Sequence, residues 1–172
     1  GELNKTIAKT GDLTDEQVTR ISAKVSTLSE TFGEENDEIV KAAQQMSKGF
    51  GISFEKALKQ VEKGFKNGAN ASGEFLDSIK EYSALAKDAG MTAQEYTKLL
   101  ESQAAEGVFA DKLADSMKEA NIRLREFNKG TSDALQKTLG KEFADNIAKG
   151  VSNGTLSTID AMQQISVKAK EV

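Results

Sequence analysis

The sequence predicts an all-α protein, a compact bundle of about seven to nine helices joined by glycine turns, with no sheet. Three observations lead to this fold class. Apolar residues recur at intervals of three and four, and the sustained apolar/polar alternation of a strand is missing. Breaks fall at glycines, of which the 172 residues hold 14 against no proline, so glycine must change the chain direction.

The clearest predicted helix runs from Thr14 to Gly33. Thr14 can cap its first amides, and Gly33 can take the left-handed conformation past its end. One apolar stripe between them consists of Val18, Ile21, Val25, Leu28 and Phe32. A second helix is expected to run to about Ser47, after which Gly49 and Gly51 break the chain.

Two further helices are predicted in the middle of the chain. Ser53 caps the first of them, which ends before Gly68. The second runs from Phe75 up to Gly90, with a bend near Ser83 because serine competes for helix hydrogen bonds.

Thr92 and Glu95 form a capping box, which predicts a helix that stops near Gly107. The stretch from Ala110 to about Phe127 carries a long apolar stripe and predicts another helix. The residues expected in the core include Val25, Leu28, Leu113, Met117 and Leu124.

The last third predicts shorter helices, separated by Gly140 and Gly150. Ser157 with Asp160 resembles a capping box at the start of the final helix. The residues that this helix is expected to bury are Ile159, Met162 and Ile165. The domain organisation follows: residues 1–13 form a flexible N-terminal segment, 14–128 the main helical domain, and 129–172 short helices packed on that same domain.

Composition excludes several classes of function. The chain has no cysteine and no histidine, which removes thiol and imidazole catalysis and the usual zinc ligands. We therefore predict that it is not an enzyme and uses no metal, cofactor or small-molecule substrate. A net charge of −4 disfavours nucleic acid and anionic membranes as partners, and no apolar run approaches the ~20 residues of a membrane span.

A helix-turn-helix DNA-binding domain over residues 82–100 is the alternative function. Ala86 lies four residues before Gly90, a spacing that lets two helices cross closely. The second helix would present Glu95, Lys98 and Glu101 to the groove. Two acids and one base there would repel phosphates, so a structural helical corner is the favoured interpretation.

Two weaker motifs favour structural explanations. Residues 66–74 are rich in small residues and could cradle an anion, but Gly73 is followed by Glu74 where a phosphate loop needs lysine. Glu101-Ser102 is similar to the catalytic glutamate of lytic transglycosylases, but the accompanying segment of that family is missing. A glycine-rich turn and a solvated helix face explain these two motifs.

Two groups of residues carry a family resemblance. The first is Lys48-Gly49-Phe50-Gly51-Ile52-Ser53-Phe54 with Ala57-Leu58, Gly64-Phe65, Gly68-Ala69-Asn70, Gly73-Glu74-Phe75-Leu76-Asp77 and Glu81-Tyr82. The second is Gly107-Val108-Phe109 with Asp111-Lys112, Asp115 and Lys118-Glu119. In these runs the sequence resembles bacteriophage tail tape-measure proteins, that is, phage-related minor tail proteins. Gly1 is not methionine, and we expect residues 1–172 to be a fragment of such a protein.

The resemblance implies a non-catalytic structural and interaction module that takes part in tail assembly and tail length determination. It implies tail proteins, and copies of the chain itself, as partners. It also implies a location inside the tail tube of the virion, or in the host cytoplasm during assembly, with a prophage as one source. Phe50, Phe54 and Phe109 are candidate contact residues, because each lies near a glycine joint. The alternative is that these rings are buried where helices meet.

Overall fold

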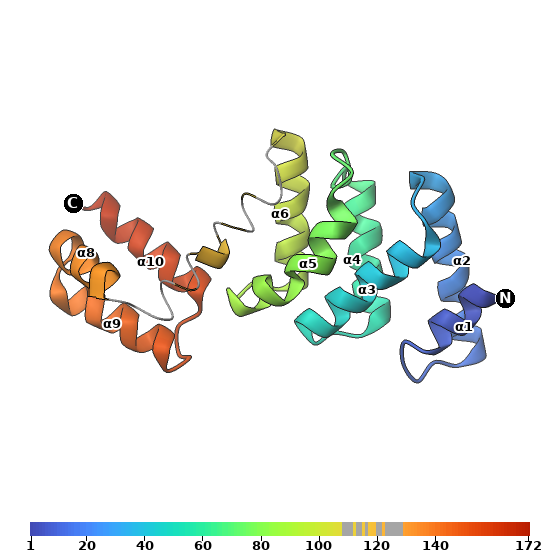
Figure 1. Cartoon of the computed structure of the whole chain (residues 1–172), viewed down its shortest axis with the longest axis horizontal. Helices are drawn as coiled ribbons and strands as arrows, with labels where there is room; N and C mark the ends of the chain where they lie inside the picture. Colours follow the sequence, from blue (N-terminus) through green and yellow to red (C-terminus); the bar gives the residue numbers. More distant parts are fainter. Residues whose placement is uncertain (108–111, 113–114, 116, 120–121, 123–128) are drawn as a thin grey trace. The chain divides into compact units, whose positions relative to one another are not determined.

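The computed structural model describes residues 1–107, 112, 115, 117–119, 122 and 129–172 (Figure 1). In these residues all regular structure is helical, which confirms the predicted all-α class. The helices are α1 (Glu2–Ala8), α2 (Asp15–Phe32), α3 (Asn36–Phe50), α4 (Phe54–Lys66), α5 (Phe75–Asp88), α6 (Ala93–Glu106), α8 (Lys129–Leu139), α9 (Lys141–Ser152) and α10 (Thr158–Lys170).

The chain forms two compact units. Unit 1 comprises Gly1–Ala84 and Thr92–Asp111, and unit 2 comprises Leu85–Met91 and Lys112–Val172. Helix α5 therefore contributes residues to both. Helix α1 lies within the first 13 residues, and its Ile7 is fully buried.

Local capping signals set the helix ends as predicted. The side chain of Thr14 accepts from the backbone N–H of Gln17 at 3.2 Å, and the Gln17 side chain accepts from the Thr14 N–H at 2.8 Å. Gly33 ends α2 in the left-handed conformation at φ 71°. Thr92 and Glu95 form the same reciprocal box at the start of α6. These contacts satisfy amides that the helix itself leaves without partners.

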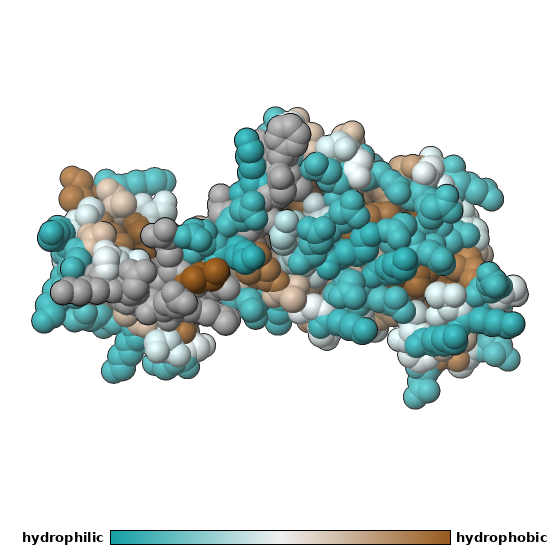
Figure 2. All heavy atoms as spheres, in the orientation of Figure 1, coloured by the Kyte–Doolittle hydropathy of each residue, from teal (hydrophilic) through white to brown (hydrophobic). Residues whose placement is uncertain are grey.

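The core of unit 1 is built from the predicted stripes. Phe65 stacks on Phe32 with ring centroids 4.7 Å apart, and it meets Phe75 edge-on at 5.3 Å. The large side chains that are almost fully buried include Ile21, Val25, Ile39, Met46, Leu58, Val61 and Ile79. The face of unit 1 visible in Figure 2 is mostly hydrophilic, as expected when apolar stripes point inward.

The expected breaks at Gly49 and Gly150 are wrong, because both residues lie inside helices, in α3 and α9. A Cβ at Gly49 would lie 2.9 Å from the Cβ of Ser83, and one at Gly150 would lie 2.8 Å from the Cβ of Leu156. These glycines allow a neighbouring segment to approach closely. Helix α3 consequently runs to Phe50, beyond the expected end near Ser47.

Unit 2 has a small core around Ile147 and Ala161. The partly buried residues packed against them are Phe143, Val151, Leu156 and Ile165. The Ser157 side chain caps α10 as predicted, accepting from the Asp160 N–H at 3.1 Å. Met162, expected to be buried, is 38% exposed, because Ala161 is the residue that α10 turns into the core.

Three of the five expected core residues lie within the described part of the chain. Val25, Leu28 and Met117 are buried, as predicted. Leu113 and Leu124 lie outside the described residues. None of the described helices is both long and apolar enough to cross a membrane.

A candidate protein-contact cleft between α2 and α4

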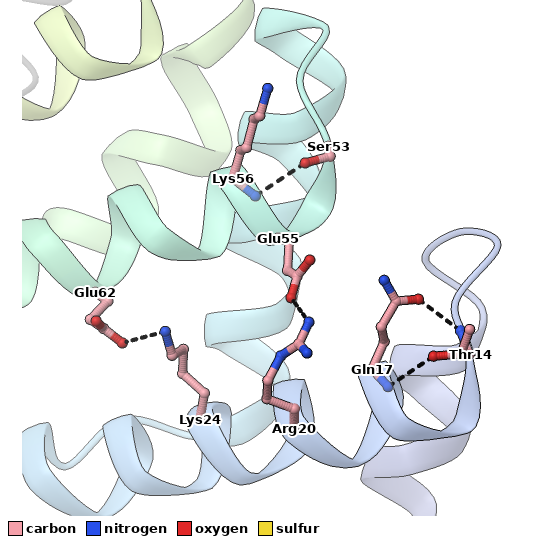
Figure 3. A network of polar contacts seen from close by, with 8 residues as sticks. All are labelled: Thr14, Gln17, Arg20, Lys24, Ser53, Glu55, Lys56 and Glu62. Carbon is pink, nitrogen blue, oxygen red and sulfur yellow. Dashed lines mark hydrogen bonds and ion pairs between the residues drawn. The ribbon is translucent and has the colours of Figure 1, made fainter.

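Two helices of unit 1, α2 and α4, present charged side chains to each other across a cleft (Figure 3). The Arg20 guanidinium on α2 forms an ion pair with Glu55 on α4. One turn further along α2, Lys24 Nζ lies 3.2 Å from Glu62 Oε2. Residues four apart lie on the same helix face, so α2 directs both cations toward α4.

The cleft has a volume of about 300 Å³ and combines a charged rim with apolar residues beneath it. Its lining consists of Arg20, Ile21, Lys24, Ser53, Glu55, Lys56, Leu58 and Lys59. Ile21 and Leu58 are almost fully buried, so only small parts of these side chains face the cleft. Four of the lining residues are cations and one is a carboxylate, which makes the site locally positive.

Ser53 fixes the start of α4 and thereby the position of the lysines in its first turns. The Ser53 hydroxyl accepts from the backbone N–H of Lys56 at 3.2 Å. In Figure 3 the Lys56 ammonium group points away from the paired side chains. Neither Lys56 nor Lys59 makes an ion pair within the described part of the chain.

The Glu62 carboxylate is charged in this arrangement. Partial burial raises its pKa, but hydrogen bonds from Lys24 and Lys66 outweigh this effect, so the pKa lies below its usual value. The Glu62 carboxylate that faces Lys24 therefore remains ionised at neutral pH.

The local charge of the cleft is positive, whereas the formal charge of unit 1 as a whole is negative. Unit 1 holds 18 acidic residues against 12 basic ones, so its formal charge is −6. Four of the 12 basic residues line the cleft, so its local charge differs in sign from that of the unit, and a local patch of opposite sign can attract a charged partner.

A model of the family "Phage-related minor tail protein" matches residues 1–172, the whole chain. The chain belongs to this family. No curated protein and no solved structure matches it. As a phage minor tail protein, the chain has a structural role in a phage tail, where partners are other tail proteins.

The minor tail protein buries two of the three predicted contact residues. Phe50 and Phe54 are each 6% exposed, which corresponds to the alternative that these rings close helix junctions. The Phe50 ring lies 6.0 Å from that of Tyr96, centroid to centroid. Phe109 lies outside the described residues. Sequence reasoning missed the α2–α4 cleft, although Arg20 and Lys24 at a four-residue spacing are visible in the sequence.

The small-residue segment 66–74 is held by carboxylates in the minor tail protein. The Asn67 side-chain amide donates to Glu101 at 3.1 Å, and that of Asn70 donates to Glu34 at 3.0 Å. Two carboxylates at this turn oppose an anion, which agrees with the structural interpretation. Glu101 lies on α6, and its carboxylate accepts the hydrogen bond from Asn67 in the turn after α4. The described residues include no group of three or more acidic side chains placed to hold a metal ion.

In the segment 82–100, the second helix of the candidate DNA-binding motif is partly buried. On α6, Ala93 is 8% exposed and Thr97 is 1% exposed, so neither is available to a groove. The exposed side chains there include Glu95 and Lys98. The division between the units also runs through this segment, since Leu85–Met91 belongs to unit 2.

Proposed function

We propose that this minor tail protein is a compact, non-catalytic module of a tape-measure protein, which acts in tail assembly and tail length determination by contact with tail proteins. The family match over the whole chain is the observation that carries the proposal. The resemblance of residues 48–82 and 107–119 to tape-measure proteins supports the finer role.

The helical architecture supports a module rather than the extended ruler itself. A single straight helix of 172 residues would span roughly 260 Å at 1.5 Å per residue. The described helices are instead short, and left-handed glycines such as Gly33, Gly51 and Gly107 end three of them. The chain would then contribute contacts within the parent protein rather than most of its length.

The absence of histidine and cysteine from the sequence supports a role without catalysis. The proposal locates the assembled protein in the interior of the tail tube, and in the host cytoplasm before assembly. The parent gene would be carried by a virion genome or a prophage.

An in-frame deletion of residues 14–128 from the parent gene tests the role in assembly. We expect absent or shortened tails in electron micrographs and a loss of infectivity. A matched control inserts a few glycine and serine residues at Gly11, where an added Cβ would meet no heavy atom within 4 Å. Tails of normal length and normal infectivity in the deletion strain would contradict the proposal.

A further inference from the structure

We propose that the α2–α4 cleft binds a carboxylate-rich helical segment of another tail protein. The inference deepens the proposed function, and it rests on that function for the identity of the partner as a tail protein. The chemistry of the cleft itself is independent of that role.

Unused hydrogen-bonding capacity in the cleft is the first argument. Lys56 and Lys59 have no anionic partner among the described residues, and each ammonium group can donate three hydrogen bonds. Arg20 uses one terminal nitrogen for Glu55 and keeps further donors of its guanidinium. Carboxylates of a partner can therefore join the cleft without breaking the pairs that link α2 to α4.

The spacing of the cations is the second argument. Arg20 and Lys24 are four residues apart on α2, and Lys56 and Lys59 are three apart on α4. Each pair spans about one helical turn. A partner helix with Asp or Glu at three- and four-residue intervals repeats its carboxylates at the same distance, about 5–6 Å.

The size of the cleft restricts what enters it. About 300 Å³ admits side chains but not a whole helix, so the partner backbone stays outside. Ile21 and Leu58 beneath the rim can contact the methylene groups of entering Glu side chains. The cleft thus suits Glu side chains presented from a helix that lies across α2 and α4.

The overall charge selects a short acidic segment over a nucleic acid. A long polyanion would experience the −6 charge of unit 1 over its whole length. A short segment interacts mainly with charges within the Debye length, about 8 Å at physiological salt. At the cleft, Glu55 and Glu62 neutralise Arg20 and Lys24, and the unpaired Lys56 and Lys59 leave a local positive charge for such a segment to meet.

Fluorescence anisotropy with the 172-residue chain tests the inference. The probe is a labelled, alanine-based peptide of about 15 residues with Glu at every fourth position, and its matched control carries Gln instead. We expect the Glu peptide to bind at low salt and the Gln peptide to bind about tenfold or more weakly. Equal affinity for both peptides, or no binding of the Glu peptide, would overturn the inference.

Two double variants of equal net charge show whether binding occurs at the cleft. Lys56→Glu with Lys59→Glu reverses the unpaired cations, and Lys48→Glu with Lys98→Glu makes the same charge change on α3 and α6. We expect the cleft variant to bind the Glu peptide about tenfold more weakly and the control to bind like wild type. Equal weakening by both variants would reveal nonspecific attraction and overturn the inference. Circular dichroism verifies that each variant is folded.

Two further comparisons distinguish an acidic peptide from a nucleic acid as the ligand, and a failure of the cleft proposal from a failure of the proposed function. A short DNA duplex that binds with the same dependence on Lys56 and Lys59 would assign the cleft to nucleic acid and overturn the inference. Failure of the peptide experiments with a positive tail-deletion result would reject the cleft and leave the proposed function standing. Peptide binding with normal tails in the deletion strain would reject the proposed function alone.

Discussion

Gly64 lies inside α4 at a place where the ring of Phe75 fills the space of a side chain. A Cβ there would lie 2.2 Å from the ring atom Cζ of Phe75, closer than real Cβ atoms come to a neighbour. The absence of a side chain at Gly64 therefore lets the start of α5 pack on α4. The Phe75 ring also contacts the ring of Phe65. The close approach of Gly64 and Phe75 therefore supports the aromatic part of the core.

Gly64→Ala is expected to lower the free energy of unfolding by about 1–3 kcal/mol, because overpacking moves the Phe75 ring from its place. Denaturant unfolding followed by circular dichroism measures the change. Gly11→Ala is the control, since a Cβ at Gly11 meets nothing within 4 Å. An unchanged midpoint for Gly64→Ala would contradict this close packing of Phe75 on α4.

Glu38 and Lys80 form a polar contact between α3 and α5 that predicts a pH dependence. The hydrogen bond from Lys80 holds the pKa of Glu38 below its usual value, with a smaller contribution from Lys41. A lowered carboxyl pKa stabilises the folded state above the unfolded pKa, and this contribution is lost as the pH falls through the folded pKa. Its loss therefore begins below about pH 4.5.

We expect Glu38→Gln to reduce the acid sensitivity of unfolding. The difference in unfolding free energy between wild type and variant should be present at pH 7 and shrink as the pH falls below 4.5. Chemical denaturation across this range measures it. A difference that stays constant with pH would show that Lys80 does not stabilise the ionised Glu38.

At the scale of elements, helix ends in this chain are set locally and helix contacts are not. Thr14, Ser53 and Thr92 lie next to the amides that they cap, so the sequence alone locates these helix starts. The sequence pattern misplaces Gly49 and Gly150 because their function depends on Ser83 and Leu156, which other segments bring close. The cleft could not be predicted for the same reason, since it needs α2 and α4 side by side.

Thr14→Ala is expected to destabilise the protein by about 0.5–2 kcal/mol, because it removes the acceptor for the Gln17 amide and half of the capping box. Thermal unfolding followed by circular dichroism provides the measurement. Thr27→Ala is the control on the same helix, since its exposed hydroxyl bonds only to the Ala23 carbonyl within the helix. Equal melting temperatures for both variants would argue against the cap.

At the scale of the whole molecule, charge argues against the alternative helix-turn-helix function. The chain carries a net charge of −4, and the exposed residues of α6 mix Glu95 with Lys98. The all-α class and most helices of unit 1 could be predicted from the sequence. They follow from the spacing of apolar residues by three and four, a pattern that extends over many residues. The expected burial of Met162 is wrong because α10 turns a different stripe, with Ala161, toward its small core.

We expect no micromolar binding of duplex DNA, even at low salt, because phosphate binding needs several cations and α6 supplies only Lys98 beside three carboxylates. An anisotropy titration with a labelled duplex checks this. Micromolar or tighter affinity that is lost in Lys98→Ala would instead favour the DNA-binding alternative over residues 82–100.

The hydrogen bond from the Tyr96 hydroxyl to the Ser78 carbonyl, at 2.8 Å, lies in a buried part of unit 1. The chain has two tyrosines and no tryptophan, and both tyrosines, Tyr82 and Tyr96, belong to unit 1. Burial also raises the pKa of Tyr96 above its usual value. Intrinsic ultraviolet emission and alkaline spectrophotometric titration therefore report on unit 1 alone, whereas far-ultraviolet circular dichroism reports on the helices of both units. The native sequence thus contains a unit-specific optical probe that needs no label.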